Sequence, residues 1–273
     1  MKDRPRHIRL QGGSNMRDIG GYRAGDGRQV RWGKVFRSGA LWGFTQADWH
    51  WFEEQGFAVV CDLRSDHERV VAPTAWPDRS IPRAVDVCYD SSHLFAHRKP
   101  ISRSGGVGAF EKNLYVRFAQ LLAPSLRGLF AALLAGETPA LVHCTAGQDR
   151  TGLAIGILLC ALGVDQETIH QDYLLSTALR VPANEVDRAS LSSLADSNIV
   201  ARFYTDLIAA NGPDVFKPRA LVDAAGTPLI EVAFDAIRTR WGSLDSYLAD
   251  MLDIRSPEIM RLRELLLEPA QAL

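Results

Sequence analysis

Ten residues in the middle of this 273-residue chain, His143 to Gly152, constrain its fold more than any other segment. They read HCTAGQDRTG, a Cys-x5-Arg spacing with a His before the Cys and a Thr after the Arg. The apolar stretch Ala140 to His143 has the length of a buried strand, and Thr151 to Leu162 has helical spacing. The sequence therefore predicts a strand, a tight loop and a helix in succession.

The loop between this strand and this helix is predicted to bind a tetrahedral anion. Five residues that curl at a helix N-terminus can turn their backbone N–H groups toward one anion. Arg150 would close the ring with a bidentate contact to two phosphate oxygens, and Gly147 permits a backbone conformation that a side chain would obstruct. The predicted substrate-binding residues are Thr145, Ala146, Gly147, Gln148, Asp149 and Arg150.

The same loop is predicted to hold a nucleophile. Cys144 is the candidate, because a thiol at a helix N-terminus beside an Arg loses its proton readily, and the Thr151 hydroxyl can hydrogen-bond its sulfur. Attack on a phosphomonoester would give a cysteinyl-phosphate that water hydrolyses. Since Arg150 and the amides supply the charge stabilisation, we expect a metal-independent phosphomonoester hydrolase without a cofactor. The alternative from another class is a phospho-binding module with weak turnover.

The motif resembles the signature loop of cysteine-dependent protein tyrosine phosphatases, and most of the chain resembles their bacterial tyrosine and lipid phosphatase family. Four other segments carry the resemblance: 15–21 (NMRDIGG), 36–41 (FRSGAL), 61–65 (CDLRS) and 172–176 (DYLLS). It implies phosphatase activity on phosphotyrosine proteins. It also implies an α/β fold of the protein-tyrosine-phosphatase type, with helices flanking a central, mostly parallel sheet and a helical lid over the site. The family usually has Lys at the position of Gln148, so phosphoinositide-directed activity is kept as the alternative.

Three carboxylic acids compete to protonate the leaving group. Asp149 lies inside the loop, an arrangement that resembles myotubularin-like and Sac-like phosphatases, in which that Asp is assigned the acid role; we favour it. Asp62 ends a predicted strand parallel to the one before Cys144, which would place its carboxylate at the same sheet edge. Its other interpretation is orientation of the loop together with Arg64. Asp78 belongs to a Trp-Pro-Asp tripeptide that we interpret as a coincidence.

The rest of the chain is predicted to form one domain over residues 1–273, with a helical lid or insertion at about 180–228. Capping signals and apolar spacing predict a strand at 57–62 and helices at 45–55, 110–122, 125–134, 166–179, 229–240, 243–252 and 257–267. If strands 57–62 and 140–143 are neighbours, Cys61 lies near Cys144. It is then either the partner for a protective disulfide or, as we favour, a small buried apolar residue.

Composition excludes several classes of partner. A net charge of −1 and a pI near 6.7 disfavour nucleic-acid binding. The longest apolar run, 153–164, is shorter than the ~20 residues that a bilayer requires, so no stable membrane insertion is expected. Residues 1–11 are charged, with no apolar segment typical of a secretory signal, so we expect a cytoplasmic protein. His93 and His97 lack a third ligand, and no metal site is predicted.

Overall fold

A five-stranded sheet forms the centre of the computed structural model, which describes residues 5–77, 81–89 and 109–270. The strand order is β1-β3-β6-β4-β5, for β1 (Arg17–Asp18), β3 (Val35–Ser38), β6 (Ala140–His143), β4 (Val59–Asp62) and β5 (Arg83–Val85). Only β1 runs antiparallel to its neighbour, and the other pairs are parallel. The predicted mostly parallel α/β sheet is therefore confirmed, with the strand before Cys144 in the middle.

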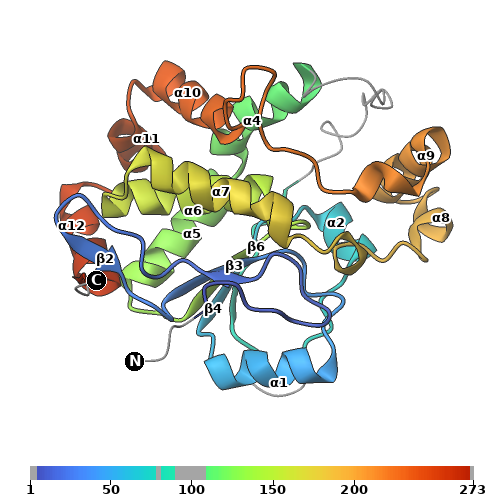
Figure 1. Ribbon diagram of the computed structural model, residues 1–273, viewed down its shortest axis with the longest axis horizontal. Helices are drawn as coiled ribbons and strands as arrows, with labels where there is room; N and C mark the ends of the chain where they lie inside the picture. Colours follow the sequence, from blue (N-terminus) through green and yellow to red (C-terminus); the bar gives the residue numbers. More distant parts are fainter. Residues whose placement is uncertain (1–4, 78–80, 90–108, 271–273) are drawn as a thin grey trace.

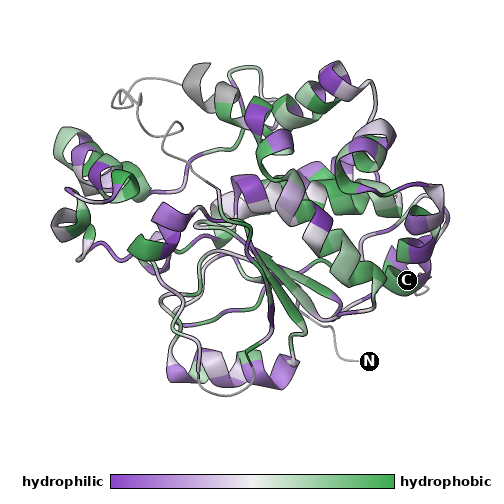
Figure 2. Ribbon diagram, turned by 180° about the vertical axis from the view of Figure 1, so that it is seen from behind, coloured by the Kyte–Doolittle hydropathy of each residue, from purple (hydrophilic) through white to green (hydrophobic). Residues whose placement is uncertain are grey.

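Helices cover both faces of this sheet (Figure 1). On one face, Leu141 and Val60 pack with aromatic residues of α1 (Gln46–Gln55), such as Phe52. On the other face, Val142 and Cys61 belong to the larger core that α5 (Ala123–Leu134) and α6 (Asp149–Leu162) complete. Figure 2 shows the hydrophobic strands between these helical layers. Both faces of the central strands are buried, which explains their continuous apolar sequence.

Local sequence signals account for the ends of the first helix. Thr45 and Asp48 form the predicted reciprocal capping box at the start of α1, and Gly56 ends it in the left-handed conformation. The predicted strand at 57–62 is shorter than expected and begins at Val59.

The remaining helices of the larger core are α4 (Ala109–Leu121), α7 (Gln166–Leu179), α10 (Ile230–Trp241), α11 (Leu244–Leu252) and α12 (Ser256–Leu266). Their ranges agree with the predicted helices to within two residues. A two-stranded antiparallel sheet of β2 (Arg28–Val30) and β7 (Leu267–Pro269) joins the C-terminal segment to the N-terminal one.

The predicted insertion at about 180–228 forms a small helical unit on one side of the molecule. It contains η1 (Pro182–Asn184), α8 (Leu191–Leu194), α9 (Ile199–Asn211) and η2 (Pro213–Phe216). A separate apolar cluster, which includes Leu191 and Val200, contacts Val71 of α2 (Asp66–Val71); Figure 1 shows α8 and α9 beside α2. Its role as a lid stays a prediction.

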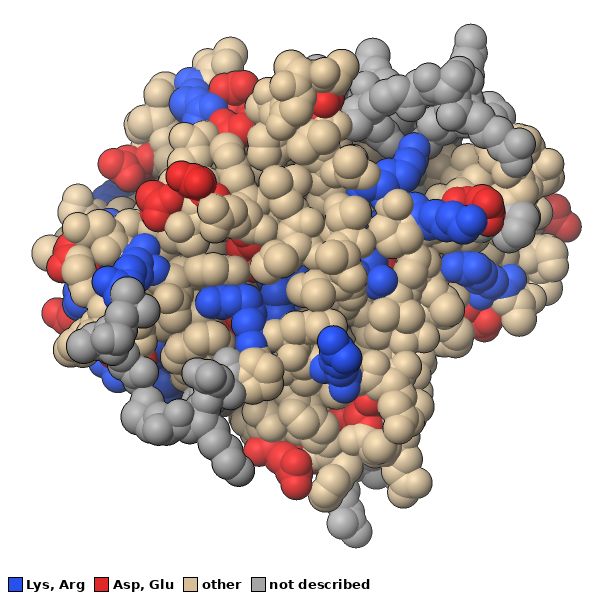
Figure 3. All heavy atoms as spheres, in the orientation of Figure 1, with Lys and Arg blue, Asp and Glu red and all other residues tan. Residues whose placement is uncertain are grey.

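Asp78, His93 and His97 lie outside the described residues. In the part of the chain that the structure describes, no helix is long and apolar enough to cross a membrane. Acidic and basic side chains are intermixed over the face in Figure 3, in keeping with the near-zero net charge.

Candidate active site

The Cys-x5-Arg loop leaves β6 after His143 and enters α6 at Asp149. At Gly147 the φ angle is +64°, and an added Cβ would lie 2.4 Å from the carbonyl carbon of Ser38. Both the backbone conformation and the end of β3 therefore exclude a side chain at this position.

Polar side chains hold the carbonyl groups of the loop. The Asn15 amide donates to the carbonyl oxygens of Ala146 (3.1 Å) and Gly147 (2.8 Å), and Arg37 donates to that of Gly147 (2.9 Å). Among the described residues, the backbone N–H groups of 145–148 donate to no protein acceptor. The loop thus keeps a set of free amide donors at the N-terminus of α6, the arrangement that binds oxyanions.

A buried ion cluster fixes the side chains that make these contacts to the loop carbonyls. Asp172 of α7 accepts hydrogen bonds from both Arg17 (2.9 Å) and Arg37, and all three side chains are at most 2% exposed. Arg17 also donates to the Asn15 side chain. Although burial acts to raise it, the two guanidinium charges hold the pKa of Asp172 well below its usual range. The cluster therefore connects β1, β3 and α7 to the loop.

Arg150 is held by acceptors that use only part of its donor set. Its Nη1 donates to Glu68 (2.6 Å), the Tyr89 hydroxyl (2.8 Å) and the Leu63 carbonyl (3.2 Å), and its Nη2 donates to the other oxygen of Glu68. In the described structure, Nε–H and one N–H of Nη2 make no hydrogen bond. These two donors lie on one edge of the guanidinium plane, so they are able to bind two oxygens of a phosphate.

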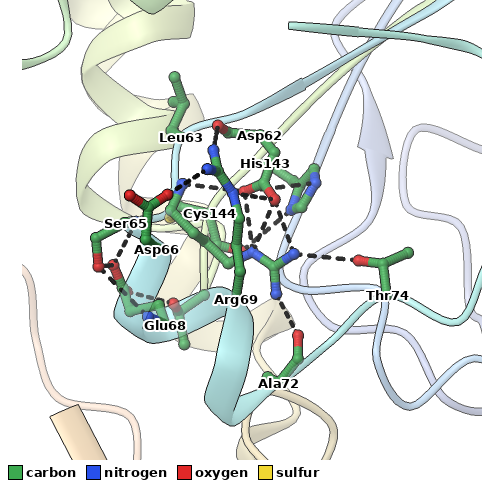
Figure 4. A network of polar contacts seen from close by, with 12 residues as sticks. Asp62, Leu63, Ser65, Asp66, Glu68, Arg69, Ala72, Thr74, His143 and Cys144 are labelled. Atoms are coloured by element: carbon green, nitrogen blue, oxygen red, sulfur yellow. Dashed lines mark hydrogen bonds and ion pairs between the residues drawn. The ribbon is translucent and has the colours of Figure 1, made fainter. Parts of the chain in front are cut away.

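Glu68 is a site residue that the sequence did not reveal. It lies in α2, where Ser65 and Glu68 form a capping box, and it also accepts a hydrogen bond from the Thr145 hydroxyl (2.6 Å). Figure 4 shows Ser65 and Glu68 beside Cys144. Burial acts to raise the pKa of Glu68, but the charge of Arg150 and these hydrogen bonds lower it to about 2. The Ser-x-x-Glu pattern was the available sequence signal, but it predicts only a helix start.

Asp149 is half-buried, and its hydrogen-bond partners are neutral. Its Oδ1 accepts hydrogen bonds from the hydroxyl of Tyr115, in α4, and from the Gln148 amide (3.1 Å). The Tyr115 hydroxyl is also 2.6 Å from the hydroxyl of Tyr173, in α7. Among the described residues, no Arg, Lys or His side chain hydrogen-bonds to this carboxyl group.

Asp62 has a different environment. Arg64 donates to both of its oxygens and Arg69 donates to one (3.2 Å), while His143 lies 3.8 Å away (Figure 4). Burial acts to raise the pKa of Asp62, but its neighbours, among them the hydrogen-bonded guanidinium groups of Arg64 and Arg69, hold it far below its usual range. Burial also lowers the pKa of His143, to about 4. Asp62 therefore lies at the predicted sheet edge as an ionised partner of two arginines, which fits the loop-orienting interpretation.

Cys144 is 3% exposed at the end of β6. The predicted hydrogen bond from Thr151 to its sulfur is not formed: the Thr151 hydroxyl is fully buried in the first turn of α6, with no partner among the described residues. Cys61 pairs with Val142 in the register of β4 and β6. Because Val142 precedes Cys144 by two positions, Cys61 and Cys144 lie on the same face of the sheet, in the same apolar core. Its thiol contacts the Ser125 carbonyl and burial raises its pKa strongly, which fits a buried apolar role.

A cation lies beside Gln148, at the position where the resemblance implies Lys. Arg180, just after α7, donates to the Gln148 side-chain oxygen (2.9 Å). The Nε and Nη2 atoms of Arg180 also donate to the two carboxylate oxygens of Glu185, at 2.9 and 2.6 Å. Its charge is therefore largely balanced within the protein.

Comparisons with known proteins cover most of this chain. The sequence model of the tyrosine phosphatase family matches residues 8–268. A Cupriavidus necator protein assigned by name to the tyrosine-protein phosphatases is 31% identical over 243 residues, which cover 88% of this chain and 82% of that protein. The triple specificity protein phosphatase PtpB of Mycobacterium tuberculosis is 30% identical, covering 94% of this chain and 98% of its own length.

Proposed function

The chain belongs to the tyrosine phosphatase family, and on that premise we propose that it hydrolyses phosphotyrosine in proteins through a cysteinyl-phosphate on Cys144. One observation carries this proposal. A single loop combines the buried cysteine with unbonded amide N–H groups and with an arginine that has two unused donors. This set supplies both a nucleophile and a receptor for the phosphoryl oxygens.

In the first step, the Cys144 thiolate attacks phosphorus. The sulfur–phosphorus bond forms as the bond between phosphorus and the tyrosine oxygen breaks, and Asp149 gives its proton to the departing oxygen. In the second step, a water oxygen attacks phosphorus and the water gives up a proton to the solvent. The sulfur–phosphorus bond then breaks, releasing phosphate and the thiolate. The Thr151 hydroxyl, which has no hydrogen-bond partner among the described residues, is available to donate to that sulfur as its negative charge returns.

The negative charge of the transition state is stabilised by Arg150 and the loop amides. Arg150 reaches the equatorial oxygens through Nε–H and Nη2–H, because Glu68 and Tyr89 occupy its other donors. Since fixed donors of this kind need no reorganisation, no metal ion is required for the step. Asp149 is preferred to Asp62 as the acid because Asp62 is bound by Arg64 and Arg69, which favour its ionised form.

A phosphoinositide substrate is the second candidate, favoured by the position of Arg180 beside Gln148. A polyphosphorylated headgroup would need additional cations near the loop. Because Glu185 already binds Arg180, we place phosphotyrosine first. Rates on a phosphotyrosyl peptide and on a soluble phosphoinositide, measured side by side, decide between them.

Cys144→Ser is the test of the nucleophile. Wild-type protein should hydrolyse a phosphotyrosyl peptide in the presence of EDTA, and Cys144→Ser should lose ~10⁴-fold or more of this activity. The variant should still bind vanadate by calorimetry, because the amides and Arg150 remain. Cys160→Ser, in the last turn of α6 and away from the loop, is the control and should keep wild-type activity. Appreciable hydrolysis by Cys144→Ser would exclude the nucleophile, and wild-type binding without turnover would indicate a phospho-binding module.

A further inference from the structure

Tyr115 joins three helices at the carboxyl group of Asp149. It projects from α4, its hydroxyl donates to Asp149 in α6, and the same hydroxyl lies 2.6 Å from that of Tyr173 in α7. Both tyrosines are almost fully buried, at 4% and 1% exposure. Such a chain of hydroxyl groups in a dry environment is strongly constrained, since each group has few alternative partners.

The direction of each hydrogen bond in this chain follows from proton counting. Burial, followed by the charge of Asp149, raises the pKa of Tyr115 well above its ordinary value, so the phenol stays protonated. A phenol has one proton to donate, and a carboxylate oxygen is the better acceptor. Tyr115 therefore donates to Asp149, and Tyr173 donates to Tyr115.

The two oxygens of Asp149 consequently have different roles. Oδ1 accepts from both Tyr115 and Gln148, whereas Oδ2 accepts no hydrogen bond from any described residue. A proton on Oδ2 leaves Oδ1 a carbonyl-type acceptor, so both hydrogen bonds persist whether or not the acid is protonated. The arrangement fixes the plane of the carboxyl group and leaves Oδ2 for proton exchange.

We propose that Tyr115 is a positioning residue that holds the Asp149 carboxyl group so that Oδ2 transfers the proton to the leaving oxygen. This inference rests on the acid role proposed for Asp149. Fixing the acid matters because proton transfer depends on a near-linear alignment at hydrogen-bond distance. Loss of the Tyr115 hydroxyl should therefore lower the rate only for substrates whose leaving group needs a proton.

The experiment is Tyr115→Phe, assayed on two substrates that differ in leaving group. The variant keeps the ring, which packs 5.3 Å from Phe118, and loses only the hydroxyl. On phenyl phosphate, a poor leaving group, kcat should fall ~10-fold with little change in KM, a part of the roughly 10²–10⁴-fold that acid catalysis supplies. On p-nitrophenyl phosphate, whose phenolate leaves readily, the loss should stay within ~2-fold.

Two further tyrosine variants separate positioning from folding. Tyr247→Phe removes an equally buried hydroxyl that donates to the Ala119 carbonyl (2.7 Å), away from Asp149, and should affect both substrates equally and weakly. Tyr173→Phe removes the donor to Tyr115 and should cause a smaller loss of kcat that is again selective for phenyl phosphate. This variant tests the inference even if Tyr115→Phe proves poorly folded. Equal losses on both substrates in Tyr115→Phe and Tyr173→Phe would overturn the inference.

A double-mutant comparison separates this inference from the proposed function. If Tyr115 acts through Asp149, then Tyr115→Phe should cause no further selective loss in an Asp149→Asn background. If Asp149→Asn alone is selective but Tyr115→Phe is not, Asp149 remains the acid and the role of Tyr115 is excluded. If Asp149→Asn slows both substrates equally, the acid assignment itself is wrong, and the inference fails with it.

Discussion

Individual residues of the site are held in buried or largely buried ion pairs. Glu68 binds Arg150, and Asp172 binds two arginines. Removing one partner from such a pair leaves an uncompensated charge and typically costs ~3–5 kcal/mol. These carboxylates therefore connect the stability of the protein to the geometry of its site.

Glu68→Gln should change how stability depends on pH. Glu68 has a native pKa of about 2 against an ordinary value of 4.5, so its ionisation stabilises the wild type above pH 4.5. That contribution is lost as the pH falls through the native pKa. Near neutral pH, the free energy of unfolding of the wild type should exceed that of the variant by ~3 kcal/mol. This difference should shrink steadily between pH 5 and pH 2. Urea unfolding of both proteins across this range is the measurement; a constant difference would contradict the assignment.

At the scale of elements, the junction of β6 and α6 depends on one backbone position. Gly147 takes a positive φ angle while its α-carbon faces the end of β3. Gly56, at the end of α1, has nearly the same φ (+63°), but nothing lies within 4 Å of an added Cβ. Substitutions at these two glycines therefore distinguish the cost of a positive φ angle, which both share, from the cost of a steric clash, which only Gly147 has.

Gly147→Ala should distort the loop, whereas Gly56→Ala should only destabilise the protein. Strain at a positive φ costs about 1–2 kcal/mol in either variant. The clash with Ser38 at 2.4 Å adds a displacement of the amide donors, so phosphatase activity should fall ~100-fold in Gly147→Ala alone. Thermal unfolding and steady-state kinetics on both variants test this, and equal activities would contradict it.

On the scale of the whole molecule, the apolar cluster at α8 and α9 is separate from the clusters on the two faces of the sheet. The larger core lies on one face of the sheet, and the smaller core at α8 and α9 includes Val71 of α2. The Asn198 amide, at the start of α9, also donates to the His67 carbonyl (3.0 Å). Because Glu68 lies in α2, this helix contacts both the 180–228 region and Arg150.

Leu191→Ala should loosen the smaller core without unfolding the larger one. Leu191 is 2% exposed, and its truncation should cost ~2–5 kcal/mol locally. Hydrogen exchange should accelerate in α8 and α9 while β6 stays protected. In contrast, Leu158→Ala in the larger core should accelerate exchange throughout the sheet. Uniform acceleration in Leu191→Ala would show that both cores unfold as one unit.

What the sequence determined by itself was local. The HCTAGQDRTG motif, the Thr45–Asp48 capping box and the apolar spacing predicted the helices and the order of strand, loop and helix correctly. These features depend on hydrogen bonds and side-chain spacing within a few residues, so the pattern reports them directly. The resemblance to a family added the fold type and the phosphatase function.

Only the tertiary structure decided which distant residues support the loop. Glu68 binds Arg150 across 82 positions, Arg17 reaches Asp172 across 155, and Tyr115 reaches Asp149 across 34. The tertiary structure also placed Asp62 between two arginines, and it left the Thr151 hydroxyl without the predicted hydrogen bond to the Cys144 sulfur. No periodicity encodes such pairings, because they arise when the order of strands brings separate loops to one edge of the sheet.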